Sequence, residues 1–138
     1  PEARMKAGRE HVVPLSPQAV ALFKRMRAHR HGDSDLVFPG TGRGKPLSDM
    51  TLTKVLRAMD VNAVPHGFRS TFRDWVAEQT HWPAELAEAA LAHVISDKTV
   101  AAYQRGSMLD KRREMMAAWG NYCDGSRGKN VVRLASPQ

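Results

Sequence analysis

The stretch His66-Gly-Phe-Arg-Ser-Thr-Phe-Arg-Asp-Trp-Val-Ala-Glu78 carries its apolar residues at helical spacing. These apolar residues fall on one stripe of the expected helix: Phe68, Phe72, Trp75 and Val76. A stripe of this width predicts that the helix is buried on one side against a hydrophobic core. His66 and Arg69 lie close together at the start of the same helix. The segment therefore predicts both a core element and a position for two polar side chains.

Further helices are expected on both sides of this stretch, from apolar periodicity and from capping residues. They cover about residues 17–30, 48–60, 83–91, 96–103 and 109–122, with Ser16 and Ser48 as N-caps of the first two. The β-branched stretch His11-Val-Val-Pro-Leu15 predicts a strand, paired across the Ala7-Gly8 turn with whatever precedes Lys6. The predicted fold class is mainly α with a small β element.

The composition is typical of an ordinary globular domain. The 138 residues are 42% hydrophobic and 25% charged, enough for one compact domain with its own core. Cys123 is the single cysteine, which excludes an internal disulfide and fits a reducing compartment. No run approaches the roughly 20 apolar residues of a membrane span. We therefore expect a cytoplasmic protein with no membrane partner.

The charge balance favours a polyanionic partner. The chain has 21 Lys and Arg against 14 Asp and Glu, a net charge of +7, and basic groups that meet phosphates release condensed counterions. Charge alone is weak evidence, because basic domains also bind RNA, ribosomes or anionic membranes. Apart from His29-x-His31, the histidines and the cysteine show no paired spacing of metal ligands, so no metal or cofactor is expected.

Three residues attract attention, although each has an ordinary structural explanation when taken alone. His66 could be a solvated residue in the first turn of a helix, and a lone H-x-x-R pattern often occurs by chance. His93, after an apolar run, is more often a hydrogen-bonded, half-buried histidine than a catalyst. Tyr103 would by default be a core tyrosine whose hydroxyl reaches the surface. Their order and spacing carry more information than any of them singly.

The segments Pro65-His-Gly-Phe-Arg69, Leu91-Ala-His93 and Ala101-Ala-Tyr103 together resemble the signature of tyrosine recombinases of the phage-integrase class. The resemblance extends to other segments, Arg4-Met-Lys6, Arg9-Glu-His-Val-Val-Pro-Leu-Ser16, Leu36-Val-Phe-Pro39 and Lys45-Pro-Leu-Ser48. It implies an integrase-like catalytic-domain fold, truncated at its N-terminal side. Residues 1–122 would form part of that catalytic domain, and residues 123–138 a flexible basic tail.

The resemblance also implies a reaction and a role for each residue. Tyr103 would be the nucleophile that forms a 3′-phosphotyrosyl intermediate, and Arg69 and His93 would bind the scissile phosphate. His66 would take the tyrosine proton, and Lys6 would protonate the leaving 5′ oxygen. Such chemistry needs no metal and no ATP. The implied function is site-specific DNA recombination, the integration or excision of a prophage or genomic island.

Two departures from the family pattern stand out. The pattern includes a further arginine, with an acidic residue nearby, on a helix upstream of the lysine hairpin, and Arg4 is too close to Lys6 to supply it. We therefore expect a fragment of a longer enzyme, with an incomplete phosphate clamp and weak or no cleavage on its own. Ala92 stands before His93, where many relatives have glycine. Satellite-phage-type integrases, which this chain resembles, tolerate that change.

Partners follow from the same resemblance. We expect double-stranded DNA at attachment sites, a tetramer of the protein on that DNA, and accessory proteins that bend DNA. Without DNA the protein would be a monomer or weak dimer. The last helix could fill its own core or pack on a neighbouring protomer, because its periodicity fits both. The residues concerned are Met115, Met116, Trp119 and Tyr122.

Two other functions remain open. A type IB topoisomerase uses the same tyrosine chemistry to relax supercoils, although the short spacing from His66 to Tyr103 and the segment from Arg4 to Ser16 favour a recombinase. A non-catalytic helical DNA-binding module would use the basic residues alone, with the histidines and the tyrosine as bystanders. Trapping of a covalent protein–DNA adduct separates the enzyme from the binding module.

Overall fold

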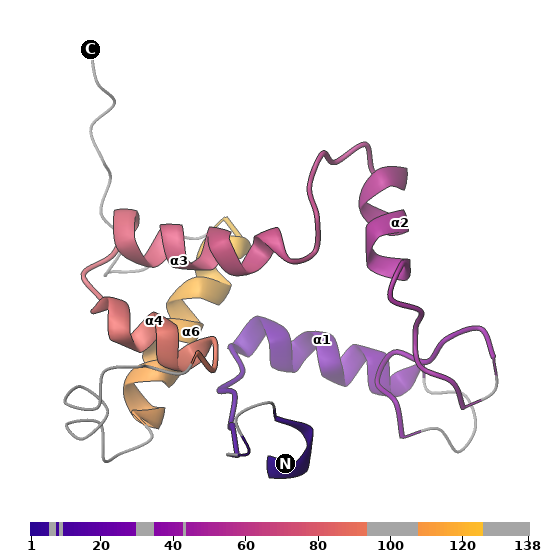
Figure 1. Ribbon diagram of the computed structural model, residues 1–138, viewed down its shortest axis with the longest axis horizontal. Coiled ribbons are helices and arrows are strands. Elements are labelled where there is room, and N and C mark those ends of the chain that lie inside the picture. Colours follow the sequence, from indigo (N-terminus) through magenta and orange to yellow (C-terminus); the bar gives the residue numbers. More distant parts are fainter. Residues whose placement is uncertain (6–7, 9, 30–34, 43, 94–107, 126–138) are drawn as a thin grey trace.

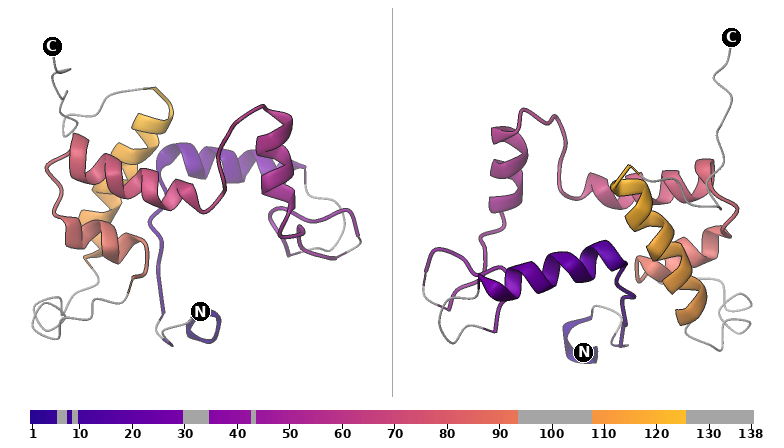
Figure 2. Two further views of the ribbon diagram at one scale, coloured as in Figure 1. Left: turned by 45° about the horizontal axis from the view of Figure 1, so that its top comes forward. Right: turned by 180° about the vertical axis from the view of Figure 1, so that it is seen from behind.

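The computed structural model describes residues 1–5, 8, 10–29, 35–42, 44–93 and 108–125. Within these residues the chain is mostly helical: η1 Glu2–Arg4, α1 Pro17–Ala28, α2 Thr51–Ala58, α3 Gly67–Gln79, α4 Ala84–Ala90 and α6 Leu109–Cys123. Helices α3, α4 and α6 pack together, α1 contacts α6, and α2 stands apart from the rest (Figures 1 and 2). The mainly α class is confirmed. The short helix expected around Tyr103 lies outside the described residues.

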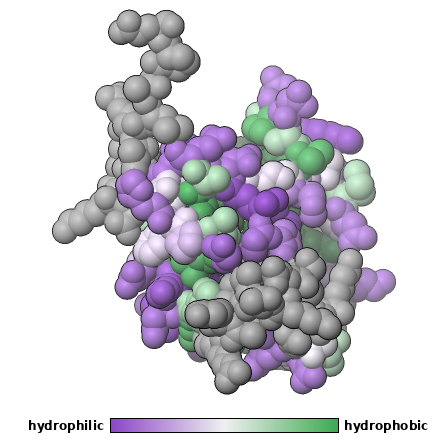
Figure 3. Space-filling model, turned by 60° about the vertical axis from the view of Figure 1, so that its left-hand side comes forward, coloured by the Kyte–Doolittle hydropathy of each residue, from purple (hydrophilic) through white to green (hydrophobic). Residues whose placement is uncertain are grey.

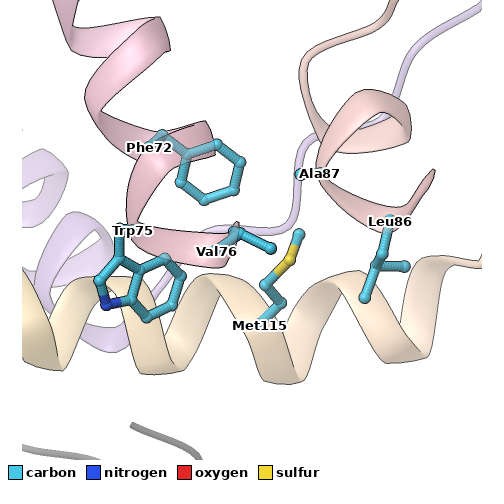
Figure 4. Packing of buried hydrophobic residues seen from close by; sticks show 6 residues of the cluster. All are labelled: Phe72, Trp75, Val76, Leu86, Ala87 and Met115. Atoms are coloured by element: carbon cyan, nitrogen blue, oxygen red, sulfur yellow. The ribbon is translucent and has the colours of Figure 1, made fainter. Parts of the chain in front are cut away.

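The hydrophobic core lies where α3, α4 and α6 meet. Its buried residues are Phe72, Trp75 and Val76 from α3, Leu86 and Ala87 from α4, and Met115 from α6. Figure 4 shows the Met115 side chain pointing from α6 toward Val76 and α4. The apolar stripe predicted for α3 is therefore buried from Phe72 onward. Phe68, one turn earlier, is 53% exposed, because the covering helices reach α3 only from the next turn.

Helix α6 packs within its own chain. Met115 has no exposed surface. The Trp119 ring lies 5.3 Å from Phe72, 5.0 Å from Trp75 and 5.4 Å from Tyr122 between ring centroids. Aromatic rings at these distances contribute beyond their buried area. In this single chain, α6 therefore packs its apolar residues against α3 and α4.

The contact between α1 and α6 depends on a small residue. Ser16 is the N-cap of α1, and its hydroxyl accepts a hydrogen bond from the Ala19 backbone N–H at 3.2 Å, as the sequence predicts. Gln18 Nε2 donates to Asn121 Oδ1 at 2.7 Å, which ties the first turn of α1 to α6. Gly120 is buried at this crossing. A Cβ there would lie 2.6 Å from both Cβ and Oγ of Ser16.

We therefore expect Gly120→Ala to destabilise the chain. Alanine favours a helix by about 1 kcal/mol over glycine, but overpacking costs about 1–3 kcal/mol, and displacement of Ser16 costs a further ~1 kcal/mol of capping. The net expectation is a loss of about 1–3 kcal/mol in the free energy of unfolding, measured by urea denaturation. Gly67→Ala is the matched control, since its Cβ would meet only Val64 Cγ2 at 3.7 Å. Equal or greater stability of Gly120→Ala would contradict this account.

Helix α2 begins later than the sequence predicts. Ser48 is not its N-cap, because the Ser48 hydroxyl lies 3.0 Å from Oγ1 of Thr51, and Met50 precedes the first helical residue. Its apolar residues are also largely uncovered. Large apolar side chains exposed on α2 and its flanks are Leu47, Met50, Leu52, Val55, Met59, Val61 and Val64. On the face of the molecule that Figure 3 shows, hydrophobic residues (green) are interspersed with hydrophilic ones (purple).

The strand predicted for His11-Val-Val-Pro-Leu15 is not formed. Residues 10–16 have no regular secondary structure, and residues 2–4 before them form the η1 turn rather than a partner strand. A strand needs a neighbour for its backbone hydrogen bonds, and here the Val12 carbonyl accepts instead from Arg112 Nη2 at 3.0 Å. Among the described residues no strand is formed; Pro39 and Pro46 make an isolated antiparallel bridge, and Thr80 is also in a bridge.

Candidate active site

The first turn of α3 positions Arg69. His66 is the N-cap of this helix, and its carbonyl accepts from the Arg69 backbone N–H at 3.1 Å. The Arg69 side chain is half-buried, and its Nη2 donates to the Leu91 carbonyl at 2.8 Å. This bond joins α3 to the end of α4. It therefore holds the guanidinium against the segment that carries His93.

A tight turn after α4 brings His93 to Arg69. The His93 backbone N–H donates to the Glu88 carbonyl at 3.0 Å, and the Ala92 backbone is in the left-handed region, with φ of 55°. The turn directs the imidazole back toward α3, where Arg69 Nη2 and His93 Nε2 are 2.7 Å apart. Two motif residues 24 positions apart in the sequence are thus in direct contact.

The conformation of Ala92 explains why glycine suits this position. The left-handed region is open to glycine but costs a residue with a Cβ about 1–2 kcal/mol. We expect Ala92→Gly to raise the free energy of unfolding by about 0.5–1 kcal/mol, less than the full strain because glycine also loosens the unfolded chain. Chemical denaturation provides the measurement. Ala90→Gly, within α4, is the control and should lower stability by about 1 kcal/mol. A loss of stability in both variants would refute the strain.

Glu88 completes a chain of polar contacts that motif spacing does not predict. Its Oε2 contacts His93 Nδ1, and its Oε1 accepts from Arg73 Nε at 2.7 Å. The Glu88 side chain is 24% exposed, and that of Arg73 is 57% exposed. Arg73 lies one turn after Arg69 on α3, a spacing that places both on one face of the helix. Two arginines on one face of α3, together with an acidic residue on the neighbouring α4, are the sequence pattern that could have indicated the ion pair between Arg73 and Glu88.

The donors and acceptors in this chain determine where an anion can bind. A guanidinium only donates, so His93 Nε2 accepts from Arg69, and Nδ1 carries the proton that is donated to Glu88. Within the described part of the chain, the recorded partners of the Arg69 guanidinium are the Leu91 carbonyl and His93, both on Nη2. For its Nε and Nη1, no partner is found among the residues that the structure describes. Arginine presents its donors in a planar fork that matches two phosphate oxygens.

Buried Arg112 ties the segment after Lys6 to α4. It is 4% exposed. Its Nη2 donates to the Val12 carbonyl at 3.0 Å and its Nη1 approaches the Ala89 carbonyl at 3.3 Å. Burial lowers the pKa of the Arg112 guanidinium from its usual high value. One side chain of α6 thereby fixes residues 10–16 next to the helix that leads to His93.

The remaining predicted site residues are placed less directly. His66 is exposed at the start of α3, and no contact is recorded between its ring and Arg69 or His93. Lys6 and Tyr103 lie outside the described residues. Among the residues that are described, no three His, Cys, Asp or Glu side chains form a group that could hold a metal ion. In the same part of the chain, no helix has the length and apolar character needed to cross a bilayer.

Comparisons with known proteins agree with the motifs. The model of the phage integrase family matches residues 3–109. The chain is 37% identical over 133 residues to the integrase of Enterobacteria phage P4, covering 92% of this chain and 30% of that protein. It is 33% identical over 135 residues to the prophage integrase IntA of Escherichia coli (strain K12), covering 96% of this chain and 32% of the relative. The integrase of Shigella phage Sf6 is 32% identical over 123 residues, covering 87% and 32%.

The chain thus spans about a third of the length of these relatives. No solved structure was found to match it significantly. The family match nevertheless covers well over half of the chain, including both Arg69 and His93. This chain belongs to the phage integrase family.

Proposed function

We propose that the chain contributes catalytic residues to a site-specific recombinase that cleaves and rejoins DNA through a 3′-phosphotyrosyl intermediate. The observation that carries this proposal is the contact between Arg69 Nη2 and His93 Nε2 at 2.7 Å. The two side chains lie side by side and half-exposed, so the Arg69 guanidinium, together with His93 once its Nε2 is protonated, fits the non-bridging oxygens of one phosphodiester. Double-stranded DNA at attachment sites is the proposed substrate, consistent with the net charge of +7.

The proposed reaction is an in-line displacement at phosphorus. The Tyr103 phenol oxygen attacks, the bond from phosphorus to the 5′ oxygen breaks, and a phosphotyrosine linkage to the 3′ end forms. His66 takes the phenol proton and Lys6 donates a proton to the departing 5′ oxygen, which leaves as a hydroxyl. The proton lost by the phenol and the proton gained by the 5′ oxygen therefore balance. Arg69 and His93 stabilise the charge on the non-bridging oxygens. Attack by a new 5′ hydroxyl reverses the steps and rejoins the strand.

A complete clamp needs more than these residues. We propose that a second arginine is contributed by a part of the catalytic domain that these 138 residues do not include, and that the chain alone cleaves weakly. We also propose that strand exchange takes place in a tetramer on DNA, because two duplexes must each be cut on both strands. Residues 1–122 would belong to the catalytic domain, and residues 123–138 would be a basic tail.

The test is to trap the covalent intermediate. The full-length protein is incubated with a pool of duplexes that carry a nick at a fixed place within a randomised segment. Cleavage near the nick releases a short oligonucleotide and prevents rejoining, so the protein stays attached. A denaturant-stable complex, enriched in one DNA sequence and joined through a phosphotyrosine in the peptide that contains Tyr103, is the expected result.

The other outcomes decide between the remaining functions. Specific DNA binding without any covalent complex would contradict the enzyme and support a binding module. Efficient relaxation of plasmids without preference for a sequence would instead support a type IB topoisomerase. The observed identity to proteins called integrases favours the recombinase.

A further inference from the structure

Glu88 has a contact on each of its carboxylate oxygens, and the two contacts lead to different elements. Oε1 accepts from Arg73 Nε of α3 at 2.7 Å, and Oε2 contacts His93 Nδ1. The His93 backbone N–H also donates to the carbonyl of Glu88 at 3.0 Å. Glu88 therefore holds His93 through both its backbone and its side chain. None of these contacts is part of the motif by which the family is identified.

The partners of the two ring nitrogens determine how His93 is protonated. A carboxylate only accepts, so Nδ1 must carry a proton to bond Glu88. On the other side of the ring, Nε2 faces Nη2 of Arg69 at 2.7 Å, and a guanidinium only donates. These two partners together require the Nδ1–H form of a neutral imidazole, with its lone pair on Nε2. The charged groups that face the ring among the described residues are Glu88 from α4 and Arg69 from α3, with Arg73 behind Glu88.

The geometry points to Glu88 as the positioning residue of His93: it keeps the proton on Nδ1 and aims Nε2 at Arg69 and at the phosphate that Arg69 binds. This inference rests on the proposed function for the identity of the phosphate. A histidine held in this way by a carboxylate has a fixed ring orientation, as in catalytic triads and around metal-bound histidines.

One consequence concerns the exchange of partners when a phosphodiester arrives. While Nε2 accepts from Arg69 it has no proton, so it cannot donate to a phosphate oxygen. It becomes a donor when it takes up one proton from solvent, and the ring then donates from Nδ1 to Glu88 and from Nε2 to the phosphate. Arg69, released from Nε2, donates to the phosphate beside it and keeps its bond to the Leu91 carbonyl. The carboxylate of Glu88 balances the positive charge of the doubly protonated ring.

The experiment reads the tautomer of His93 directly. The full chain is labelled with ¹⁵N-histidine, and the ring ¹⁵N chemical shifts of His93 are recorded by NMR at a pH at which the ring is neutral. In the wild-type chain, Nδ1 of His93 should be protonated and Nε2 unprotonated. Glu88→Ala should lose this pattern, whereas Glu88→Gln, which keeps an oxygen acceptor in the same place, should retain part of it. Glu85→Ala, on the exposed side of the same helix, is the control for loss of a carboxylate and should behave as wild type.

Arg73→Ala separates positioning from simple bracing of α3 against α4. It breaks the same ion pair as Glu88→Ala but leaves the contact with His93, so it should keep the Nδ1–H pattern. Cleavage of the nicked substrate should fall about 10- to 100-fold in Glu88→Ala, the usual effect of removing a carboxylate that orients a functional histidine. The inference is wrong if the two variants, Arg73→Ala and Glu88→Ala, lose the tautomer pattern and the cleavage activity to the same extent. It is also wrong if neither variant loses them.

A result that refutes the positioning role of Glu88 can be told apart from a result that refutes the proposed function. The tautomer is measured on the protein without DNA and does not depend on catalysis. Absence of a covalent complex with the wild-type protein would refute the proposed reaction and leave the orientation of His93 intact. A covalent complex combined with an unchanged His93 tautomer in Glu88→Ala would refute the positioning role alone.

Discussion

The variant Tyr103→Phe is expected to form no denaturant-stable complex with the nicked substrate while still binding DNA. Phenylalanine keeps the aromatic ring but lacks the oxygen that would bond to phosphorus. Without this nucleophilic oxygen the phosphotyrosine linkage cannot form. Gel electrophoresis under denaturing conditions measures the complex, and a mobility shift under native conditions measures binding.

The chain itself offers a matched control, since it contains two tyrosines, Tyr103 and Tyr122. Tyr122 belongs to α6, where its ring is stacked on Trp119 at 5.4 Å and lies 5.7 Å from Trp75. The Tyr122→Phe variant removes the same atom from the other tyrosine and should form the complex as wild type does. Loss of the complex in Tyr122→Phe with retention in Tyr103→Phe would mean that the wrong tyrosine has been assigned.

The variant Arg69→Lys is expected to lower the rate of cleavage about 10²- to 10³-fold, the usual effect of removing one donor from a site that stabilises a transition-state charge. Lysine preserves the charge but not the geometry. The Nη2 group of Arg69 bonds the Leu91 carbonyl at 2.8 Å and His93 Nε2 at 2.7 Å, and in the proposed function its other nitrogens would bind the phosphate. A single ammonium cannot hold those positions and also present a planar pair of donors to an anion.

Single-turnover cleavage of the nicked substrate at saturating protein provides the measurement, because it separates the chemical step from DNA binding. Arg113→Lys is the control. Arg113 is an exposed residue of α6 whose Nη1 pairs with Asp110 Oδ1 at 2.8 Å, an i,i+3 pair of the kind that contributes little. Near wild-type cleavage by Arg69→Lys would show that charge alone suffices at this position, and the assignment of Arg69 as a bidentate phosphate ligand would fail.

Much of the fold follows from short-range patterns in the sequence. Helices α1, α3, α4 and α6 lie close to their predicted bounds, and Ser16 caps α1 as expected. Helical periodicity and capping depend on residues within about four positions of each other, so the sequence contains them in readable form. The start of α2 is the exception. Ser48 has the chemistry of an N-cap, but its hydroxyl contacts the Thr51 side chain instead of the helix backbone.

The strand predicted at residues 11–15 shows the limit of such patterns. Its β-branched residues fit a strand, but a strand forms only when a second segment provides backbone partners. Here the Val12 carbonyl is taken by Arg112, a residue 100 positions later. Local preference is therefore overruled by a tertiary contact that no window of sequence contains.

The candidate site also has features that the sequence reveals and features that only the tertiary structure reveals. The identities of His66, Arg69 and His93, and their order along the chain, are read directly from the sequence, where they carry the resemblance to the family. Other features of the site become visible only when α4 packs on α3. They are the contact between Arg69 and His93, the left-handed backbone of Ala92, and the position of Glu88 and Arg73 behind the imidazole. The reason is range: these contacts depend on distances between segments about 20 residues apart, which periodicity within a single helix does not encode.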